Sequence, residues 1–230
     1  MFGKKEKIEV DARQILLETA ARLFAEHGFE AVSTRKLAEE SKVNIAMIAY
    51  YFGSKEKLFQ AIIEERLPKT REMLQGFLDS DMHPWEKFCA VIEAYIEKIF
   101  TNHAFTKLIY RELSLQQRPA HSERILEGIM NNWGIMYKIL EEGQQKGIFR
   151  KDIDKTMTLT STFGSIVQIV NTPCILAKAM NKTNDNEVFS ADSKARLLTH
   201  LKQMLKSHLW INPNDSIYDP LSNMDFNPAY

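Results

Sequence analysis

The sequence predicts an all-α fold, in which a small N-terminal helix-turn-helix domain precedes a larger helical bundle. Apolar residues recur at helical spacings along almost the whole chain, and no segment shows the two-residue alternation of a strand. The chain has 230 residues, of which 44% are hydrophobic. That composition can bury a sizeable core in one or two domains, so we expect most of the chain to be folded.

Charge and composition indicate the cellular compartment of the protein and limit how it could attract nucleic acid. Thirty basic and thirty acidic residues give no net charge, so any attraction to nucleic acid must come from local placement. No apolar segment follows the basic N-terminal residues, and no run of eighteen apolar residues occurs, so we expect a cytoplasmic protein without a membrane span. Cys89 and Cys174 show no CxxC spacing and are expected to be buried, reduced thiols without a functional role.

The first part of the chain is expected to form three short helices and a longer fourth one. Gly28 can end the first helix in a left-handed cap. Ser33 is a candidate N-cap for the second helix, and Asn44 is one for a third helix over residues 45–51. Ser54 can cap the fourth helix. The apolar face predicted for the first helix comprises Ile15, Leu16, Ala20, Leu23 and Phe24.

The rest of the chain reads as a helical bundle. Pro68 is expected to bend the fourth helix rather than end it. Residues 156–180 are predicted to form one helix that Pro173 kinks or stops, and residues 181–190 are predicted to form a loop. Three further amphipathic helices are predicted to start near Pro84, Ala104 and His121. A last helix over residues 192–210 carries an apolar stripe of Leu197, Leu198, Leu201, Met204, Leu205 and Leu209.

Two short helices joined by a turn of three or four residues have the geometry of a helix-turn-helix. Spacing alone is weak evidence, because helical proteins contain many such pairs. The residue types of the third helix strengthen it, since small apolar side chains with little charge can touch thymine methyl groups in the major groove. The alternative is that these side chains are core, which is what we expect for Ile48 and Phe52.

The stretch from Ile15 to Phe59 resembles the DNA-binding domain of the TetR (tetracycline-repressor-like) family of bacterial transcriptional regulators. The resemblance rests on three segments in order, LFAEHGFEAVS, TRKLAEESKV and NIAMIAYYFGSKEKLF. It implies a DNA-binding head with an N-terminal arm at residues 1–53, and a helical body at 54–212 that dimerises and binds a small effector. Residues 213–230 are expected to form an irregular tail.

Carried onto this sequence, the family pattern implies two kinds of DNA contact. Thr34 and Lys55 would bind phosphates at helix starts, where backbone N–H groups favour phosphate oxygens. Arg35 would reach a base edge, because a guanidinium can donate two hydrogen bonds to guanine. Residues 45–47 would face the major groove, and Tyr50 would meet the DNA backbone. The residues implied to contact DNA are Thr34, Arg35, Asn44, Ile45, Ala46, Met47, Tyr50, Tyr51 and Lys55. For Lys55, the alternative is an ordinary capped surface helix.

Two positions depart from the family pattern. Lys42 stands in the turn where the family usually has glycine, and a positive φ there would cost about 1 kcal/mol. Ala49 replaces the first of two customary aromatic residues, so Tyr50 and Tyr51 are expected to share the backbone contact, with one of them packing inward. Acidic residues offset much of the charge of the N-terminal arm, which is expected to be a solvated tail rather than a groove-binding segment.

The body is expected to hold an apolar effector of unknown identity. Most aromatic residues at helical spacing are core, so at least half of the candidates are expected to be packing only. The residues that are candidates to line the cavity are Phe77, Phe88, Tyr95, Phe105, Met130, Trp133, Tyr137 and Phe163. Arg111 and Glu112 are adjacent among apolar residues and are expected to form a structural ion pair rather than a ligand anchor.

The last two long helices are expected to pair with their copies in a second subunit. The leucine stripe motivates this prediction, together with the small residues Ser161, Gly164 and Ser165, which allow close helix approach. A homodimer with recognition helices about 34 Å apart would match a palindromic operator in double-stranded DNA, with repression as the expected effect.

The rival hypothesis is a helical ligand-binding protein or enzyme in which the helix-turn-helix is incidental. The six histidines form neither an HExxH nor an ExxH pattern, and the sequence has no glycine-rich phosphate loop and no nucleophile elbow. We therefore predict no metal, no cofactor and no catalytic residue.

Overall fold

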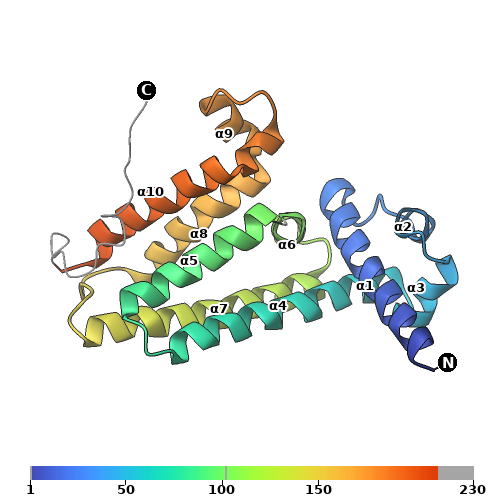
Figure 1. The fold of residues 1–230 in the computed structure, drawn as a ribbon, viewed down its shortest axis with the longest axis horizontal. Coiled ribbons are helices and arrows are strands. Elements are labelled where there is room, and N and C mark those ends of the chain that lie inside the picture. Colours follow the sequence, from blue (N-terminus) through green and yellow to red (C-terminus); the bar gives the residue numbers. More distant parts are fainter. Residues whose placement is uncertain (1, 102, 212–230) are drawn as a thin grey trace. The chain divides into compact units, whose positions relative to one another are not determined.

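A computed structural model describes residues 2–101 and 103–211, and these residues form two compact helical units. Figure 1 shows the helices in chain order. Unit 1 comprises residues up to 79 and residues 101–135, whereas unit 2 comprises residues 80–100 and those from 136 onward. Unit 1 contains α1 (Phe2–His27), α2 (Thr34–Ser41), α3 (Ile45–Phe52), α4 (Lys55–Asp79), α6 (Ala104–Leu115) and the start of α7 (Pro119–Gln145). Unit 2 contains α5 (Pro84–Thr101) up to residue 100, the end of α7, α8 (Lys155–Asn171), α9 (Pro173–Ala179), the 3₁₀ helix η1 (Asp185–Phe189) and α10 (Ala191–Leu209).

The all-α prediction is confirmed. Within the described ranges the only β pairing is an isolated antiparallel bridge between Phe149 and Trp210. The predicted domain boundary at residue 53 lies inside unit 1, because α4 and α6 both pack against α1. The division into a head and a body at that residue therefore stays a prediction, and the predicted tail at 213–230 lies outside the described residues.

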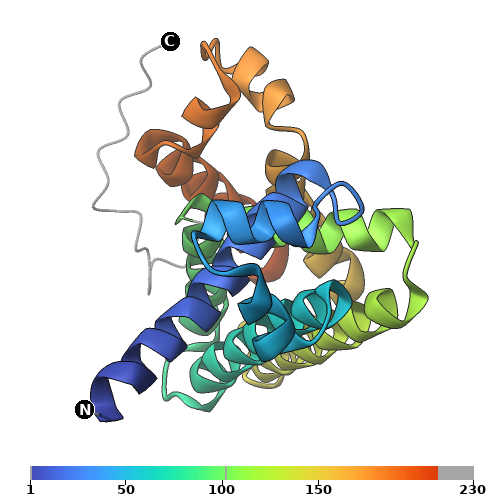
Figure 2. The same cartoon turned by 90° about the vertical axis from the view of Figure 1, so that its right-hand side faces the viewer.

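The centre of unit 1 is the buried face of α1, around which α2, α4 and α6 pack. Figure 2 shows α1 with the two short helices beside it. Three phenylalanines form the aromatic part of this core, because the ring centroids of Phe24, Phe29 and Phe59 lie 5.1–5.9 Å apart. Each fully buried phenylalanine contributes about 1.5–3 kcal/mol to folding. The head is thus built on the same core as the helices that follow it.

Polar and aromatic contacts join the helices of unit 2. Lys87 of α5 is buried and donates a hydrogen bond of 2.9 Å to Glu142 of α7. Trp85 of α5 meets Trp210 edge to face at 5.9 Å. Two further ion pairs connect α5 to α10, Glu93 with Lys202 and Glu97 with Lys194. These contacts place α10 along α5.

Four expectations need correction. Ile15 is 39% exposed, because it lies at the edge of the apolar face of α1 rather than within it. Cys174 is exposed on α9, and only Cys89 is buried, where desolvation raises the pKa of its thiol to about 12. Residues 185–189 of the predicted loop form η1, and the N-terminal arm continues α1 back to Phe2.

The helix predicted over residues 156–180 stops at the proline. α8 ends at Asn171, α9 begins at Pro173, and their axes differ by 89°. Proline cannot donate a backbone hydrogen bond and its ring clashes with the preceding turn, whereas it fits the first position of a new helix. No single helix in the described ranges is long and apolar enough to cross a membrane, although α8 and α9 pass that test together as a bent pair.

Candidate nucleic-acid interface

The side-chain caps predicted for the short helices α2 and α3 are confirmed. The hydroxyl oxygen of Ser33 accepts a hydrogen bond of 3.1 Å from the Lys36 N–H at the start of α2. The side-chain oxygen of Asn44 accepts one of 2.9 Å from the Ala46 N–H at the start of α3. Each cap satisfies a backbone donor that the helix itself leaves unpaired. Both helices therefore begin where local chemistry dictates.

The turn between these helices is held by a left-handed residue. Lys42 has φ 55° and ψ 31°, so the positive φ that the sequence left conditional is present. Its N–H donates to the carbonyl of Glu39, and the Val43 N–H donates to that of Ala38 at 3.1 Å. This six-to-one closure is the Schellman pattern, which usually employs glycine at the left-handed position. The turn keeps its shape with lysine there, at a backbone cost of about 1 kcal/mol.

The two faces of α3 differ sharply. Ile48 and Phe52 are buried, with 2% and 7% of their surface exposed, and they anchor the helix to unit 1. Ile45 lies on the same side as Phe52, seven residues on, but it is 49% exposed at the start of the helix, whereas Tyr50 on the other side is 70% exposed. Ala46 is also exposed, whereas Met47 is half-buried against the core. Contact of these apolar side chains with water is unfavourable, so the exposed surface of this eight-residue helix suits a binding partner.

The two adjacent tyrosines have different environments. Tyr51 packs partly buried against the core, and its ring lies edge to face with that of Tyr50 at 5.1 Å. Tyr50 projects into solvent. The prediction that one tyrosine packs inward is confirmed, and the inward residue is Tyr51.

The first turn of α2 carries both the guanidinium of Arg35 and the backbone N–H groups of the helix N-terminus. Arg35 is exposed and has no hydrogen-bond or ion-pair partner among the described residues. Thr34 is half-buried at the first position of the helix. Since the helix N-terminus carries partial positive charge, this end of α2 suits an anion, and the arginine is free to extend from it.

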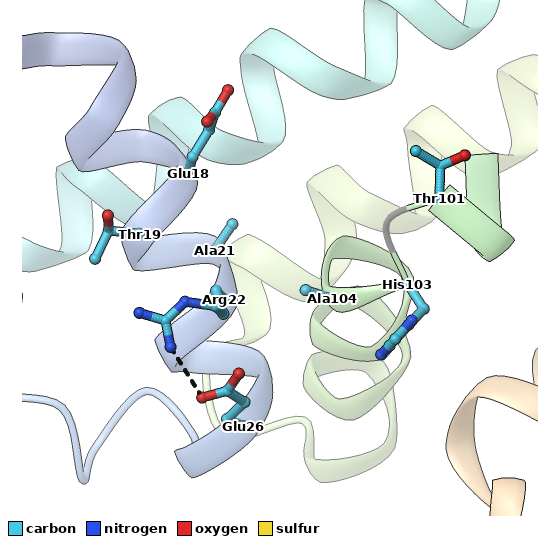
Figure 3. Close-up of a pocket in the computed structure, with 8 residues that line it drawn as sticks. All are labelled: Glu18, Thr19, Ala21, Arg22, Glu26, Thr101, His103 and Ala104. Atoms are coloured by element: carbon cyan, nitrogen blue, oxygen red, sulfur yellow. Dashed lines mark hydrogen bonds and ion pairs between the residues drawn. The ribbon is translucent and has the colours of Figure 1, made fainter. Parts of the chain in front are cut away.

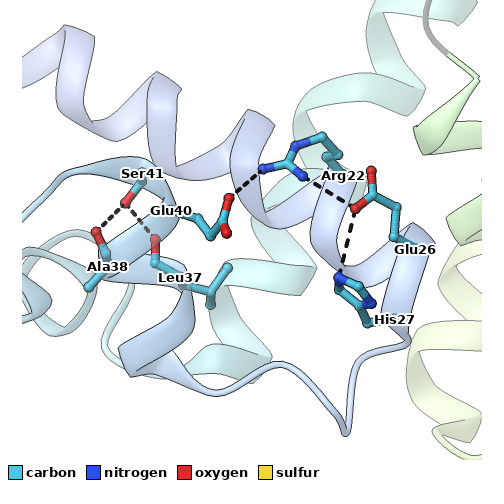
Figure 4. A network of polar contacts seen from close by, with 7 residues as sticks. All are labelled: Arg22, Glu26, His27, Leu37, Ala38, Glu40 and Ser41. Carbon is cyan, nitrogen blue, oxygen red and sulfur yellow. Dashed lines mark hydrogen bonds and ion pairs between the residues drawn. The ribbon is translucent and has the colours of Figure 1, made fainter.

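Ion pairs brace α2 against α1. Arg22 of α1 donates to Glu40 of α2 at 3.1 Å and to Glu26 of α1 at 3.3 Å, as Figure 4 shows. Inside α2, the buried Ser41 hydroxyl donates to the Leu37 carbonyl at 2.6 Å. Exposed pairs of this kind contribute at most about 1 kcal/mol each, so they orient the helix more than they stabilise it.

Lys55 lies at the start of α4 but turns back into the protein. Its ammonium donates hydrogen bonds to the carbonyls of Phe29 at 3.0 Å and Val32 at 3.2 Å. The same nitrogen lies 4.2 Å from the centroid of the Phe29 ring. Two of its three N–H groups are thus used within the protein, which leaves one for a phosphate.

An exposed carboxylate, that of Glu56, also lies at the start of α4. Its own backbone N–H and the Ser54 hydroxyl hold the pKa of Glu56 below its ordinary value. A phosphate at this helix end would meet that carboxylate. The sequence prediction did not name Lys57, which is exposed in the first turn of α4, or Lys42, which is exposed before α3, as contacts with DNA. Their exposure could not be read from the charge pattern alone.

The predicted pair of Arg111 and Glu112 is wrong. Glu112 is buried and accepts two hydrogen bonds from Arg118, at 3.0 and 2.6 Å. The guanidinium of Arg111 instead lies over Gly28, and a Cβ placed on that glycine would come within 2.7 Å of it. Adjacent residues of a helix point in different directions, so the partner comes from the turn that follows α6.

Among the described residues, two surface cavities lie within unit 1 and a third lies within unit 2. The first, of about 510 Å³, lies between α1 and the start of α6, where Figure 3 shows Glu18, Arg22, Glu26 and His103. Burial lowers the pKa of His103. The second, of about 330 Å³, is bordered by the end of α1, by α6 and by Arg118. The third, of about 480 Å³, lies among α8, α9 and α10 and is mainly apolar.

None of the eight candidate cavity residues lines these three cavities. Phe88, Phe105 and Phe163 are buried, whereas Met130 is 48% exposed. The candidates divide between the units, with Phe77, Phe105, Met130 and Trp133 in unit 1 and Phe88, Tyr95, Tyr137 and Phe163 in unit 2. In unit 2 the rings of Tyr95 and Phe163 meet edge to face at 4.9 Å. The effector cavity stays a prediction.

Comparison with known proteins matches two family models to this chain. Residues 16–62 match the model of bacterial regulatory proteins of the tetR family, and residues 81–171 match a tetracyclin repressor-like C-terminal domain. The HTH-type transcriptional repressor NicS of Pseudomonas putida is 31% identical over 145 residues, which cover 61% of this chain and 67% of NicS. The fatty acid metabolism regulator protein of Bacillus subtilis is 26% identical over 160 residues, which cover 68% and 80% of the two chains.

Solved structures share the fold. The fatty acid degradation regulator FadR from Bacillus halodurans has a TM-score of 0.65 at 18% identity, covering 84% of this chain and 94% of that one. The ketosteroid transcriptional regulator KstR2 of Mycobacterium tuberculosis has a TM-score of 0.61 at 22% identity, covering 82% and 93%.

Proposed function

Because the chain belongs to the TetR family of bacterial regulatory proteins, we propose that its α2–turn–α3 head binds a palindromic operator, one half-site for each subunit of a homodimer. The family makes it a DNA-binding transcriptional regulator whose activity a small molecule modulates, and not an enzyme. The hypothesis of an incidental helix-turn-helix is therefore set aside. Repression is the proposed effect, because NicS is named a repressor.

The exposed apolar face of α3 is the observation that carries this proposal. Ile45 at the start of the helix and Ala46 beside it are exposed although they are apolar, while Ile48 and Phe52 anchor the helix to unit 1. Such side chains can contact thymine methyl groups in the major groove, with Met47 beside them. The free guanidinium of Arg35 would read a base edge, most simply a guanine.

Other residues of the head would hold the DNA backbone. We assign Thr34 to a phosphate at the start of α2, and Tyr50 and Asn44 to the backbone beside α3, because all three are accessible on or next to the two helices. Tyr51 would support the backbone contact of Tyr50, because the two rings meet edge to face. Lys55 would give its one remaining N–H to a phosphate while its other two hold the loop before α2.

The proposed dimer forms through α8 and α10. Along α8, Ser161, Gly164 and Ser165 form an exposed strip of small residues, and nothing lies within 4 Å of a Cβ placed on Gly164. Both helices also expose large apolar side chains, since Met157, one turn before Ser161 on α8, is 56% exposed and Met204 of α10 is 37% exposed. Small residues allow helices of two subunits to approach closely, and the exposed methionines gain burial there.

The proposed effector is apolar or amphipathic. This follows from the aromatic residues of the helical body and from the relative in Bacillus subtilis that is named for fatty acid metabolism. The effector would favour a spacing of the two heads that does not fit the operator. The coupling free energy needed is modest, about 1–3 kcal/mol.

Fluorescence anisotropy with the DNA upstream of the protein's own gene tests the proposed function. We expect a labelled duplex from that region to bind much more tightly than a scrambled duplex of equal length, and sedimentation to give a dimer at micromolar concentration. Addition of fatty acids or their CoA thioesters should release the duplex. Equal affinity for both duplexes, or a stable monomer, would contradict the proposal.

A further inference from the structure

Two cations contact one buried aromatic ring in the segment that precedes α2. Phe29 is 6% exposed and lies in the connection between α1 and α2. The Lys55 ammonium lies 4.2 Å from the ring centroid, and the guanidinium carbon of Arg118 lies 4.1 Å from it. Cations are attracted to the negative face of an aromatic ring, most strongly where water is excluded. Phe29 is therefore held by residues from two other elements.

Arg118 is itself fixed in place. It directly precedes α7, and its side chain is 17% exposed. Its Nε and one terminal nitrogen donate to the two carboxylate oxygens of Glu112, whose side chain is 3% exposed. The other terminal nitrogen donates to Glu30 at 2.7 Å. A two-pronged bond to a buried carboxylate gives the guanidinium one orientation.

The held segment determines where α2 begins. Lys55 fixes the carbonyls of Phe29 and Val32, and Arg118 fixes the ring of Phe29 and the carboxylate of Glu30. Ser33, the cap of α2, follows at once, and the proposed contacts Thr34 and Arg35 come next. A displacement of this segment would move those two side chains together.

We propose that Arg118 is a positioning residue for operator binding. Glu112 orients the guanidinium of Arg118, and Arg118 holds the Phe29 ring. The position of Phe29 then places the start of α2 so that its first residues meet the DNA. This inference rests on the proposed function. It assigns Arg118 no contact with DNA, which separates it from a phosphate-binding arginine.

The test compares variants in operator titrations at several salt concentrations. Arg118→Met alone leaves the Glu112 carboxylate buried without its partner, so it is paired with Glu112→Met, because apolar replacement of both members of a buried ion pair often preserves stability. We expect the double variant to remain a folded dimer and to lose operator affinity by up to about tenfold, because the cation–π contact can favour the DNA-binding position of the segment by no more than its own free energy. Its salt slope should equal that of the wild type.

Three further variants make the result specific. Phe29→Leu, which removes the ring but keeps an apolar side chain, should reproduce the loss of the double variant. Arg118→Lys keeps the charge without the two-pronged bond and should restore part of the affinity. Arg124→Gln is the matched control, since Arg124 lies on the first turns of α7 and pairs with Glu64 at an exposed site. It should bind the operator like the wild type.

The outcomes separate the explanations. Wild-type affinity in the folded double variant and in Phe29→Leu would overturn the proposal and leave Arg118 a structural role only. A salt slope lower by about one unit in the double variant would also overturn it, because the arginine would then contact a phosphate. If the wild type itself did not prefer the operator to a scrambled duplex, the proposed function would fail, and this inference with it.

Discussion

The side-chain oxygen of Asn44 accepts a hydrogen bond of 2.9 Å from the Ala46 N–H, and this bond caps the start of α3. Ile48 and Phe52 anchor this eight-residue helix to unit 1, and the cap fixes where it begins. The helix cannot rely on its own propensity, since isolated helices of this length are unstable in water.

Removal of this cap should lower stability. Asn44→Ala should reduce the free energy of unfolding by about 1 kcal/mol, whereas Asn44→Ser, which keeps a capping oxygen, should change it little. Urea unfolding followed by circular dichroism measures both. Equal stability of the alanine and serine variants would show that the cap contributes nothing.

Two glycines of α7 should respond to alanine in opposite directions. At Gly143 an added Cβ would lie 2.0 Å from the buried ring of Phe149, whereas nothing lies within 4 Å of one at Gly134. Gly143→Ala should therefore lower stability by about 1–3 kcal/mol through overpacking. Gly134→Ala should raise it by about 0.5–1 kcal/mol, because alanine is the better helix former. Thermal unfolding of the two variants compares them directly, and a shift in the same direction would refute this packing argument.

Stability should fall in acid through the pair of Glu142 and Lys87. Burial alone would raise the pKa of Glu142, but hydrogen bonds from Lys146 and Lys87 hold it below its ordinary value. A carboxyl group whose pKa is lower in the folded state stabilises the fold above its unfolded pKa, about 4.3, and this contribution is lost as the pH falls through the folded pKa.

Glu142→Gln isolates this contribution. The variant should be less stable than the wild type by about 1–3 kcal/mol at pH 7, since it weakens a hydrogen bond to a buried ammonium. The difference should shrink as the pH falls below about 4.3, where this carboxyl group becomes protonated in the unfolded wild-type chain, and it should be lost as the pH falls through the lower folded pKa. The control is Glu141→Gln, which breaks an exposed pair with Lys155 and should change stability by less than about 1 kcal/mol. A gap between Glu142→Gln and the wild type that is independent of pH would contradict the assignment.

Lys55→Met should show both roles proposed for this lysine. Loss of its bonds to Phe29 and Val32 should lower the melting temperature. Affinity should fall for a scrambled duplex and more for the operator, because the loop that places Thr34 and Arg35 loses its anchor, and the salt slope should fall by about one unit if the remaining N–H binds a phosphate. An unchanged slope would leave Lys55 only the role of holding the loop.

The sequence predicted those features that neighbouring residues determine. Ser33, Asn44 and Ser54 cap helices through bonds to N–H groups two or three residues ahead, so their residue types and positions were sufficient. The left-handed backbone of Lys42 was only a condition, because the sequence alone did not decide whether a lysine would keep the shape of the turn. Pro173 ended a helix for a reason that lies in its own ring.

Features that depend on tertiary contacts were not predicted. The Lys55 ammonium bonds carbonyls 23 and 26 residues away, which no local pattern shows. Glu112 turned to Arg118 across the break between α6 and α7 rather than to its neighbour Arg111. Ile15 fits the helical stripe but lies at its edge, and only the packing of the other helices decides that such a position stays exposed.

Base reading by α2 and α3 is the central claim, and Arg35→Ala tests it most directly. The variant and the wild type are titrated against the operator, against operators with single base changes and against a scrambled duplex. We expect the variant to lose about 1–3 kcal/mol on the operator and to discriminate less at one base position, because one bidentate contact is removed. A folded, dimeric variant with wild-type affinity and wild-type discrimination at every position would contradict the account.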